Sequence, residues 1–220
     1  MGESTSLHLA GVDYAALPPG FSADHMVVDM DGHRVLGAEP CKGNAYSHYL
    51  PEPWPTGTQH EFSGRFMYTD PEDGAGIVFA SRNPLGEDRY LRLRRLEETP
   101  QWHLAPKGVA ILEGNTRDIA PEAGRWYRFR VQWKLETEAT LLRARLWPED
   151  EPEPAHWPID CRTSEALQGT VGVWSVGPGW KYWDDLHWLA TGEETWEWRE
   201  DFQSYEPEAR PPYWLHFGVN

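Results

Sequence analysis

The sequence predicts an all-β fold, a sandwich of two antiparallel sheets with the jelly-roll arrangement of strands. Short segments in which apolar and polar residues alternate follow one another along most of the 220 residues, and such segments at regular spacing are typical of β-sandwiches. The 20 glycines and 19 prolines supply frequent turns, and the 13 tryptophans supply large apolar side chains for a core. No long segment has the periodicity of a helix.

The individual strands are predicted in order along the chain. The runs HMVVD and HRVLGA flank the turn Asp31-Gly32, which is a strong hairpin signal. The segment 60–70 (HEFSGRFMYTD) alternates, which places its aromatic residues on one face. Further strands are predicted, in chain order, at 76–82, 89–96, 101–106, 109–114, 126–136, 139–149, 170–176 and 181–190.

Several of these segments resemble a known family. The stretches RYLRLRR (89–95), GRWYRFRVQ (124–132) and GTVGVWSVGPGWKYWDDL (169–186) are similar to the concanavalin A-like, laminin-G-like jelly-roll modules that occur as repeats in large bacterial proteins. The resemblance covers about residues 25–190. It implies the jelly-roll fold but leaves the function open, because that fold hosts lectins, glycosidases, lyases and plain spacers.

The end of the chain repeats features of its beginning. Residues 198–220 and 12–21 both place an acidic-aromatic pair before a double proline and a further aromatic residue. In the family that the chain resembles, such a segment is similar to the opening of a following repeat. We therefore expect a jelly-roll domain over 1–192 and a C-terminal segment over 193–220 that docks on the same domain. The alternatives are the stub of a following repeat, and self-association by strand addition to a neighbouring molecule.

Composition limits the partners. The net charge of −15 would repel nucleic acid, so no nucleic-acid partner is expected. The opening MGESTSLHLAGVDY lacks the features of a secretory signal, and no run approaches the ~20 apolar residues of a membrane span. We expect a soluble protein without a membrane partner, extracellular or virion-associated if it belongs to a larger or exported assembly. Cys41 and Cys161 are expected to be reduced thiols, with one bridge as the alternative.

Arginines recur two residues apart in three predicted strands. The pairs are Arg92 and Arg94, Arg128 and Arg130, and Arg143 and Arg145. Because strand side chains alternate, each pair points away from the core. If the strands belong to one sheet, the pairs form a guanidinium ladder suited to an acidic glycan, because guanidinium binds carboxylate or sulfate bidentately. The acidic surplus favours the alternative, which is cross-strand pairing with Glu and Asp.

Tryptophans outside strand centres are candidates for stacking on a sugar ring. Most tryptophans lie inside strand patterns and are expected in the core. Trp180 follows Gly-Pro-Gly, which favours a position at a loop tip, and Trp102 lies in the short segment QWHLAP. Both are therefore added to the candidate ligand-binding residues.

The resemblance also implies a calcium ion. Modules of this kind often hold Ca²⁺ with an acidic residue at the end of the strand KYWDD, here Asp184 or Asp185, together with ligands near the N-terminal region. Asp29 or Asp13 would supply the latter, since calcium requires about six to eight oxygen ligands. The alternative is that one aspartate of the strand accepts buried backbone hydrogen bonds. For DMDG (29–32), a hairpin turn is the simpler interpretation.

Catalytic motifs are weak. The carboxylate spacing of jelly-roll glucanases, Glu-x-Asp-x-x-Glu, does not occur. A lyase would take its base or acid from His103 or Tyr90 and would use an arginine of the ladder to neutralise a uronate. We therefore expect a non-catalytic carbohydrate-binding or adhesion module, stabilised by calcium. The alternatives are a structural repeat that joins copies through its C-terminal segment, and a lyase or hydrolase that acts on acidic glycans.

Overall fold

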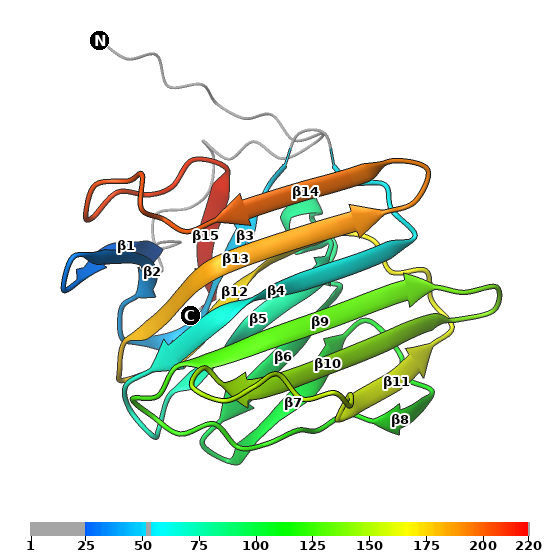
Figure 1. Cartoon of the computed structure of the whole chain (residues 1–220), viewed down its shortest axis with the longest axis horizontal. Helices are drawn as coiled ribbons and strands as arrows, with labels where there is room; N and C mark the ends of the chain where they lie inside the picture. Colours follow the sequence, from blue (N-terminus) through cyan, green and yellow to red (C-terminus); the bar gives the residue numbers. More distant parts are fainter. Residues whose placement is uncertain (1–24, 52–53, 220) are drawn as a thin grey trace, which may run out of the picture.

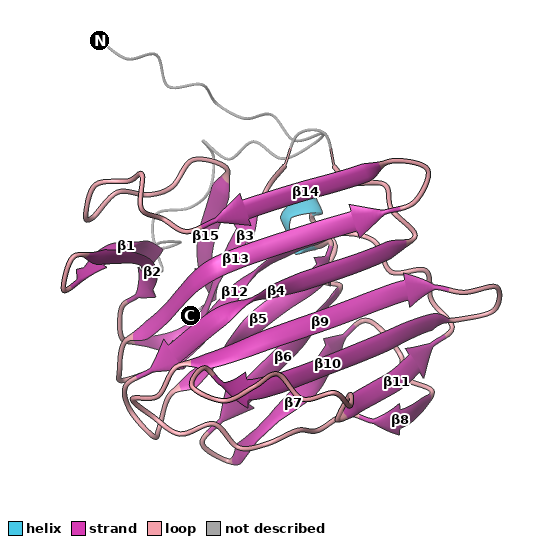
Figure 2. Ribbon diagram, in the orientation of Figure 1, coloured by secondary structure: helices cyan, strands magenta, loops and turns pink. Residues whose placement is uncertain are grey.

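Two antiparallel β-sheets are stacked face to face (Figures 1 and 2). The structure is a computed structural model that describes residues 25–51 and 54–219. The larger sheet contains, in spatial order, β1 (His25–Met30), β2 (His33–Ala38), β13 (Lys181–Thr191), β4 (Gln59–Tyr68), β9 (Tyr127–Leu135), β10 (Thr140–Pro148), β11 (Ile159–Thr163) and β8 (Glu113–Asn115), and β14 (Thr195–Glu200) pairs with β13. The smaller sheet contains β15 (Trp214–Val219), β3 (Cys41–Tyr49), β12 (Thr170–Gly177), β5 (Gly74–Ser81), β6 (Tyr90–Leu96) and β7 (Thr99–Lys107). The predicted jelly-roll sandwich is confirmed.

Most of the predicted strands are present. At the β1–β2 turn, Asp31 and Gly32 adopt φ values of 56° and 87°, as the Asp-Gly signal predicts. The segment 109–114 is an exception, because only its end enters a strand and Leu112 is 60% exposed. β3 was not predicted as a strand, because glycine, asparagine and histidine interrupt its apolar pattern. The described ranges contain one short 3-10 helix, η2 (Asn83–Leu85), and no helix that is long and apolar enough to cross a membrane.

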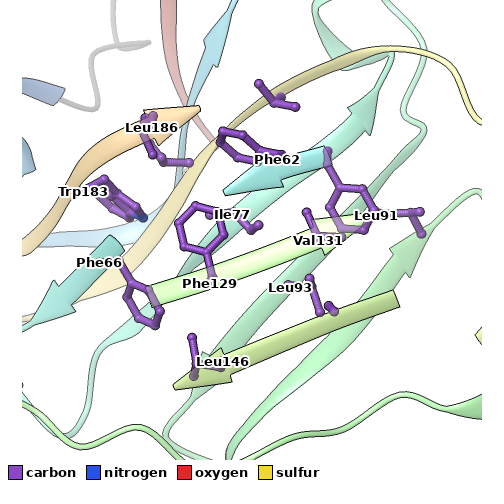
Figure 3. Packing of buried hydrophobic residues seen from close by; sticks show 14 of the residues in the cluster. Phe62, Phe66, Ile77, Leu91, Leu93, Phe129, Val131, Leu146, Trp183 and Leu186 are labelled. Atoms are coloured by element: carbon purple, nitrogen blue, oxygen red, sulfur yellow. The ribbon is translucent and has the colours of Figure 1, made fainter. Parts of the chain in front are cut away.

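The core lies between the sheets and is built from the inward side chains of alternating strands. Figure 3 shows Phe62, Phe66, Phe129, Val131 and Leu146 from the larger sheet packed near Ile77, Leu91 and Leu93 from the smaller one. Trp102, Trp133, Trp183 and Trp188 are completely buried in the same cluster. Such large apolar side chains provide most of the stabilisation by burial.

The C-terminal segment supplies strands to both sheets (Figure 1). β14 pairs with β13, and β15 pairs with β3. Between these strands, Phe202 is completely buried, and Trp214 reaches the same core. The connecting loop also binds the N-terminal hairpin: Val27 N donates to Ala209 O (2.9 Å), and Glu208 N donates to Val27 O (2.8 Å). The described part of the segment therefore completes the sandwich of its own chain.

β13 organises the larger sheet. On one side it pairs with β4, with a register shift between Asp184 and His187. On the other side, Lys181–Trp183 pair with β2, whereas Leu186–Thr191 pair with β14. Asp185, within the shift, has a φ of 51°, as expected of a β-bulge. The bulge therefore lets the N-terminal hairpin and the C-terminal segment share one edge of β13.

A completely buried ion pair holds the turn that precedes β13. Lys181 Nζ lies 2.9 Å from Asp73 Oδ1, and both side chains are 0% exposed. Lys181 Nζ also donates to the carbonyl oxygens of Gly177 (2.9 Å) and Gly179 (2.8 Å). Asp73 accepts hydrogen bonds from the N–H groups of Gly179 (2.7 Å) and Asp70 (3.0 Å). Each charged group is thus fully satisfied, which a buried pair requires.

Both cysteines are free thiols, as expected from the sequence. Cys41 is half-buried in β3, and Cys161 is buried in β11. Burial raises the pKa of Cys161 to about 11, so this thiol is protonated and inert at neutral pH.

The buried ion pair leads to a stability prediction. Lys181→Met should lower the free energy of unfolding by about 3–5 kcal/mol, because it leaves the Asp73 carboxylate buried and unpaired. Adding Asp73→Asn should recover much of the loss. As a control, Lys107→Met breaks an exposed pair with Asp88 (3.3 Å) and should cost less than about 1 kcal/mol. Urea unfolding measures all four proteins, and equal effects at positions 181 and 107 would contradict the prediction.

Buried histidines lead to a second prediction. Burial lowers the pKa of His48 to about 3 and the pKa values of His60 and His216 to about 4, from 6.5. Below about pH 6.5 the unfolded chain binds protons that the folded chain does not, so the free energy of unfolding should fall as the pH drops towards 4. Each histidine contributes about 1.4 kcal/mol per pH unit in this window. Denaturant titrations at about pH 7 and about pH 5 measure the difference, and a His60→Gln variant should show a shallower dependence.

Candidate functional site

Strands of the smaller sheet bring arginines and aromatic rings together on its outer face. In β6, Leu91 and Leu93 point into the core, so the residues that alternate with them point outward. Strands β3 and β12, which lie beyond β5 in the same sheet, add an asparagine, a tyrosine and a tryptophan. The arginine–aromatic cluster comprises Asn44, Tyr46, Tyr90, Arg92, Arg94 and Trp174.

Trp174 forms the floor of this cluster. It is completely buried, and its ring centre lies 5.2 Å from Arg92 Cζ and 5.3 Å from Arg94 Cζ. Arg92 Cζ also lies 5.3 Å from the ring centre of Tyr90. These are cation–π distances. The two guanidinium groups therefore cover the indole, which explains how a tryptophan on the outside of a sheet has no exposed surface.

Hydrogen bonds hold the cluster in one arrangement. Arg92 Nη1 donates to the Tyr46 hydroxyl (3.0 Å) and to Asn44 Oδ1 (3.4 Å). Trp174 Nε1 donates to the same oxygen of Asn44 (2.8 Å), and the hydroxyls of Tyr46 and Tyr90 are 3.0 Å apart. These hydrogen-bond partners of Arg92 are neutral, so they orient its guanidinium without cancelling the charge.

No described carboxylate forms an ion pair with the two arginines of the cluster. Among the described residues, the ion pairs within 4.0 Å involve neither Arg92 nor Arg94. The Nε atoms of both arginines are buried without a hydrogen-bond partner in the described part of the chain. Burial lowers the pKa of Arg94, and the charge of Arg92 lowers it further, although Glu98 acts in the opposite direction. Two half-buried like charges therefore lie side by side.

The neighbouring strand β7 extends the positive region. His103 lies opposite Arg94 in the β6–β7 ladder, and its backbone forms an isolated antiparallel β-bridge with that of Arg117. Burial lowers the pKa of His103; its hydrogen bond with Gln101 O (2.9 Å) acts in the opposite direction, and three nearby arginines lower it further. Burial is the largest cause of the lowered pKa and the arginines add to it, so an anion bound beside His103 would raise that pKa.

The other four candidate arginines lie on the opposite outer face. Arg128 and Arg130 belong to β9, and Arg143 and Arg145 belong to β10, both in the larger sheet. The hypothesis of one ladder of six arginines is therefore wrong. Alternation points every pair away from the core, but the two sheets turn their outer faces in opposite directions.

Carboxylates pair with each of these four arginines. The distances are 2.9 Å from Arg128 to Glu149, 3.1 Å from Arg128 to Asp185, 2.5 Å from Arg130 to Glu61, 3.0 Å from Arg143 to Asp160 and 2.5 Å from Arg145 to Glu153. This is the cross-strand pairing that the acidic surplus favours. Partly exposed pairs contribute at most about 1 kcal/mol each, and they leave this face without free guanidinium groups.

The two candidate tryptophans differ in exposure. Trp102 is 0% exposed and stacks on Phe66, with 4.9 Å between ring centres. Its assignment as a ligand-binding residue is wrong, because alternation in β7 points it into the core together with Leu104. Trp180 is half-buried after the Gly-Pro-Gly turn, and its ring stacks on Tyr182 at 6.0 Å. It lies at the start of β13 and outside the arginine–aromatic cluster.

Asp184, the first expected calcium ligand, is engaged by the chain itself. Its side chain is completely buried, and its Oδ2 lies 2.5 Å from Arg65 Nη2 and 2.6 Å from His33 Nε2. Its other oxygen is buried without a hydrogen-bond partner in the described residues. The positive charge of Arg65 already compensates this carboxylate.

The remaining expected ligands do not complete a calcium site. Asp185 pairs with Arg128, and Asp29 accepts the N–H of Gly32 (2.6 Å) within the hairpin turn. Asp13 lies outside the described residues. Within the described ranges, no group of three or more His, Cys, Asp or Glu side chains has the geometry to hold a metal ion. The described residues that we expected to bind calcium are thus engaged by the side chains and the hairpin turn of the chain itself.

Tyr90 was expected at the site for the lyase alternative, whereas Trp174, Tyr46 and Asn44 were not expected there. Trp174 lies inside the predicted strand 170–176, and most tryptophans in strand patterns were expected in the core. The signal that places it outside is alternation, since Val171 and Val173 point inward. Tyr46 and Asn44 lie in β3, which was not predicted as a strand.

Comparison with known proteins gives similar structures but no family. No protein-family model matches the chain, and no curated protein matches its sequence. Among solved structures, the carbohydrate-binding module CBM66 from Bacillus subtilis is 9% identical with a TM-score of 0.45, covering 76% of this chain and 95% of that one. A Bacillus subtilis protein of unknown function with a galectin-like fold is 13% identical with a TM-score of 0.44, covering 77% and 88%.

A more distant similarity involves an enzyme. The catalytic domain of a glycoside hydrolase family 131 protein from Coprinopsis cinerea is 13% identical, with a TM-score of 0.31, and covers 78% of this chain and 75% of that one. The fold is established by the strand pairing of the chain itself, and the function is inferred from its residues.

Proposed function

We propose that the protein is a non-catalytic module that binds an acidic glycan through the arginine–aromatic cluster. The observation that carries this proposal is the pair of half-buried guanidinium groups of Arg92 and Arg94, which no described carboxylate neutralises. The chain has 35 acidic residues and pairs the other candidate arginines with them. An unpaired cationic site in so acidic a protein favours an anionic ligand.

The chemistry of the cluster suits a carboxylate or a sulfate on a sugar. Guanidinium binds either anion through two parallel hydrogen bonds. Bringing Arg92 and Arg94 together away from water costs free energy, and an anion placed between them would offset that cost. Asn44 and His103, half-buried at the border of the cluster, offer polar groups to ring hydroxyls. A uronate or a sulfated sugar is therefore the ligand class that we expect.

Short-range recognition is compatible with the large negative charge of the chain. Charges on exposed surfaces are screened beyond about 8 Å at physiological ionic strength. The two guanidinium groups act on a ligand within hydrogen-bonding distance, whereas most of the acidic residues act from farther away. A glycan with isolated anionic groups suits such a site better than the continuous charge of a nucleic-acid backbone.

The lyase alternative has one structural support. Tyr90 and His103 lie on the same outer face as Arg92 and Arg94, so the groups expected for that chemistry are brought together. However, Tyr90 is only 5% exposed, and its hydroxyl contacts the hydroxyl of Tyr46. A proton-transfer group must reach the substrate, so we favour binding without cleavage.

The assembly alternative also has one support. Among the described strands, β14 pairs only with β13, and β15 pairs only with β3, so each has one free edge. Free edges are the sites at which strands of another molecule add. The C-terminal segment therefore offers two edges to a second copy while remaining docked in its own sandwich.

Substituting the two arginines tests the proposed function. The double variant Arg92→Gln, Arg94→Gln should lose affinity for uronate or sulfated polymers by about tenfold or more per guanidinium, because charge-assisted hydrogen bonds contribute about 1.5–3 kcal/mol each. Affinity electrophoresis in gels containing pectate, alginate or heparin measures this loss. Arg143→Gln, Arg145→Gln is the matched control, since it removes the same charge from the opposite face and should retain binding.

Three outcomes of that experiment decide between hypotheses. Equal retention of both double variants would reject the cluster as the binding site. Ultraviolet absorbance from an unsaturated uronate product would support the lyase alternative. Loss of retention by the wild-type protein in chelator would support calcium binding through ligands other than the expected set.

Association of copies is tested separately. Deleting residues 198–220 would remove Phe202 and Trp214 from the core and unfold the sandwich, so that deletion does not test assembly. Sedimentation velocity of the intact chain over a wide concentration range does. Concentration-dependent assembly, lost when lysines replace the exposed Thr195 and Glu197 of β14, would support it. A monomer at every concentration would reject it.

A further inference from the structure

A depression of about 630 Å³ lies on the outer face of the larger sheet, opposite the arginine–aromatic cluster. It is bounded by β13, the end of β14 and the loop that follows, and we call it the β13–β14 depression. We propose that it binds a neutral sugar unit. This site is separate from the proposed acidic-glycan site and goes beyond it.

The bulge of β13 builds the floor of the depression. Asp185 has a φ of 51°, which turns its carboxylate to the outer face, where the side chain is 40% exposed. Aspartate tolerates this left-handed conformation better than most residues. Ser63 of β4 and Arg128 of β9 complete the floor. Bulges beside binding sites often re-aim a side chain in this way.

The C-terminal segment builds the wall. Phe202 is completely buried with a φ of 59°, a conformation that a bulky residue adopts only where its surroundings enforce it. Glu200 accepts hydrogen bonds from the N–H of Phe202 and from the hydroxyl of Tyr205, both at 3.0 Å. These contacts hold the loop that carries Ser204 beside the floor, so the wall is formed before any ligand arrives.

The lining carries charges of both signs, Arg128 and Arg199 together with Asp185, Glu200 and Asp201. Arg128 pairs with Asp185 (3.1 Å), and Arg199 pairs with Glu197 (2.6 Å) just outside the depression. Both arginines therefore have carboxylate partners, in contrast to the arginine–aromatic cluster, and the lining keeps a small acidic excess. An anion gains no net attraction at such a site, whereas a neutral ligand can bond its donors and its acceptors.

The available donors and acceptors match sugar hydroxyls. A hydroxyl both donates and accepts, so the hydroxyls of a sugar can donate to the Asp185 carboxylate and accept from the 70% exposed Arg199 guanidinium. The hydroxyls of Ser63 and Ser204 have no hydrogen-bond partner among the described residues and can serve in either role. The volume lies within the range of small-ligand sites and accommodates about one or two sugar rings.

Amide chemical shifts test this proposal. The isotope-labelled full chain is titrated with the methyl glycosides of glucose, galactose, mannose, fructose and N-acetylglucosamine. At least one probe should shift the amide signals of residues 185–187 and 199–205. Asp185→Asn keeps the left-handed conformation but removes the charge, and it should weaken binding about tenfold. Ser204→Trp, in an exposed loop, should fill the depression and abolish binding.

Two control variants establish that the effect belongs to the depression. Asp31→Asn makes the same chemical change at another left-handed position, in the β1–β2 turn (φ 56°), and should bind the probe like the wild type. The double variant Arg92→Gln, Arg94→Gln should also bind it normally, so that failure of the acidic-glycan proposal is distinguishable. The proposal is overturned if no probe shifts the signals of the depression, or if Ser204→Trp binds as well as the wild type.

Discussion

The larger sheet depends on the irregularity of one strand. β13 is 11 residues long and would otherwise offer a single continuous edge. The bulge between Asp184 and His187 divides that edge, so β2 pairs before it and β14 after it. The buried Asp184 carboxylate is held at this point by Arg65 of the adjacent strand β4. Two segments from opposite ends of the chain are thereby placed side by side, and they bond each other between Val27 and Ala209.

The two outer faces of the sandwich treat their charges differently. On the larger sheet, the arginines of β9 and β10 form ion pairs with carboxylates of other strands and loops. On the smaller sheet, Arg92 and Arg94 lie over the indole of Trp174, with neutral hydrogen-bond partners for Arg92. Cation–π contacts orient a guanidinium group without removing its charge. The arginines of β9 and β10 are therefore paired with carboxylates, while Arg92 and Arg94 form no ion pair with a described carboxylate.

Local patterns were sufficient to predict most of the fold. Alternation in 60–70 and 126–136 indicated β4 and β9, and Asp31-Gly32 indicated the first hairpin, because these signals depend on neighbouring residues alone. The same alternation correctly pointed each arginine pair away from the core. Alternation could not identify β3, because this strand contains several polar residues that become buried only through pairing with β12 and β15.

By itself, the sequence determined the class of fold, the frequency of turns and which side chains of each strand share a face. Only the tertiary structure decided which strands became neighbours. Arg92 and Arg128 have the same local pattern, yet they face opposite directions because long-range pairing assigns β6 and β9 to different sheets. Likewise, Trp102 lies in the core and Trp174 lies under two guanidinium groups. Alternation specifies two faces of a strand, and only the packing of the second sheet determines which of them becomes the interior.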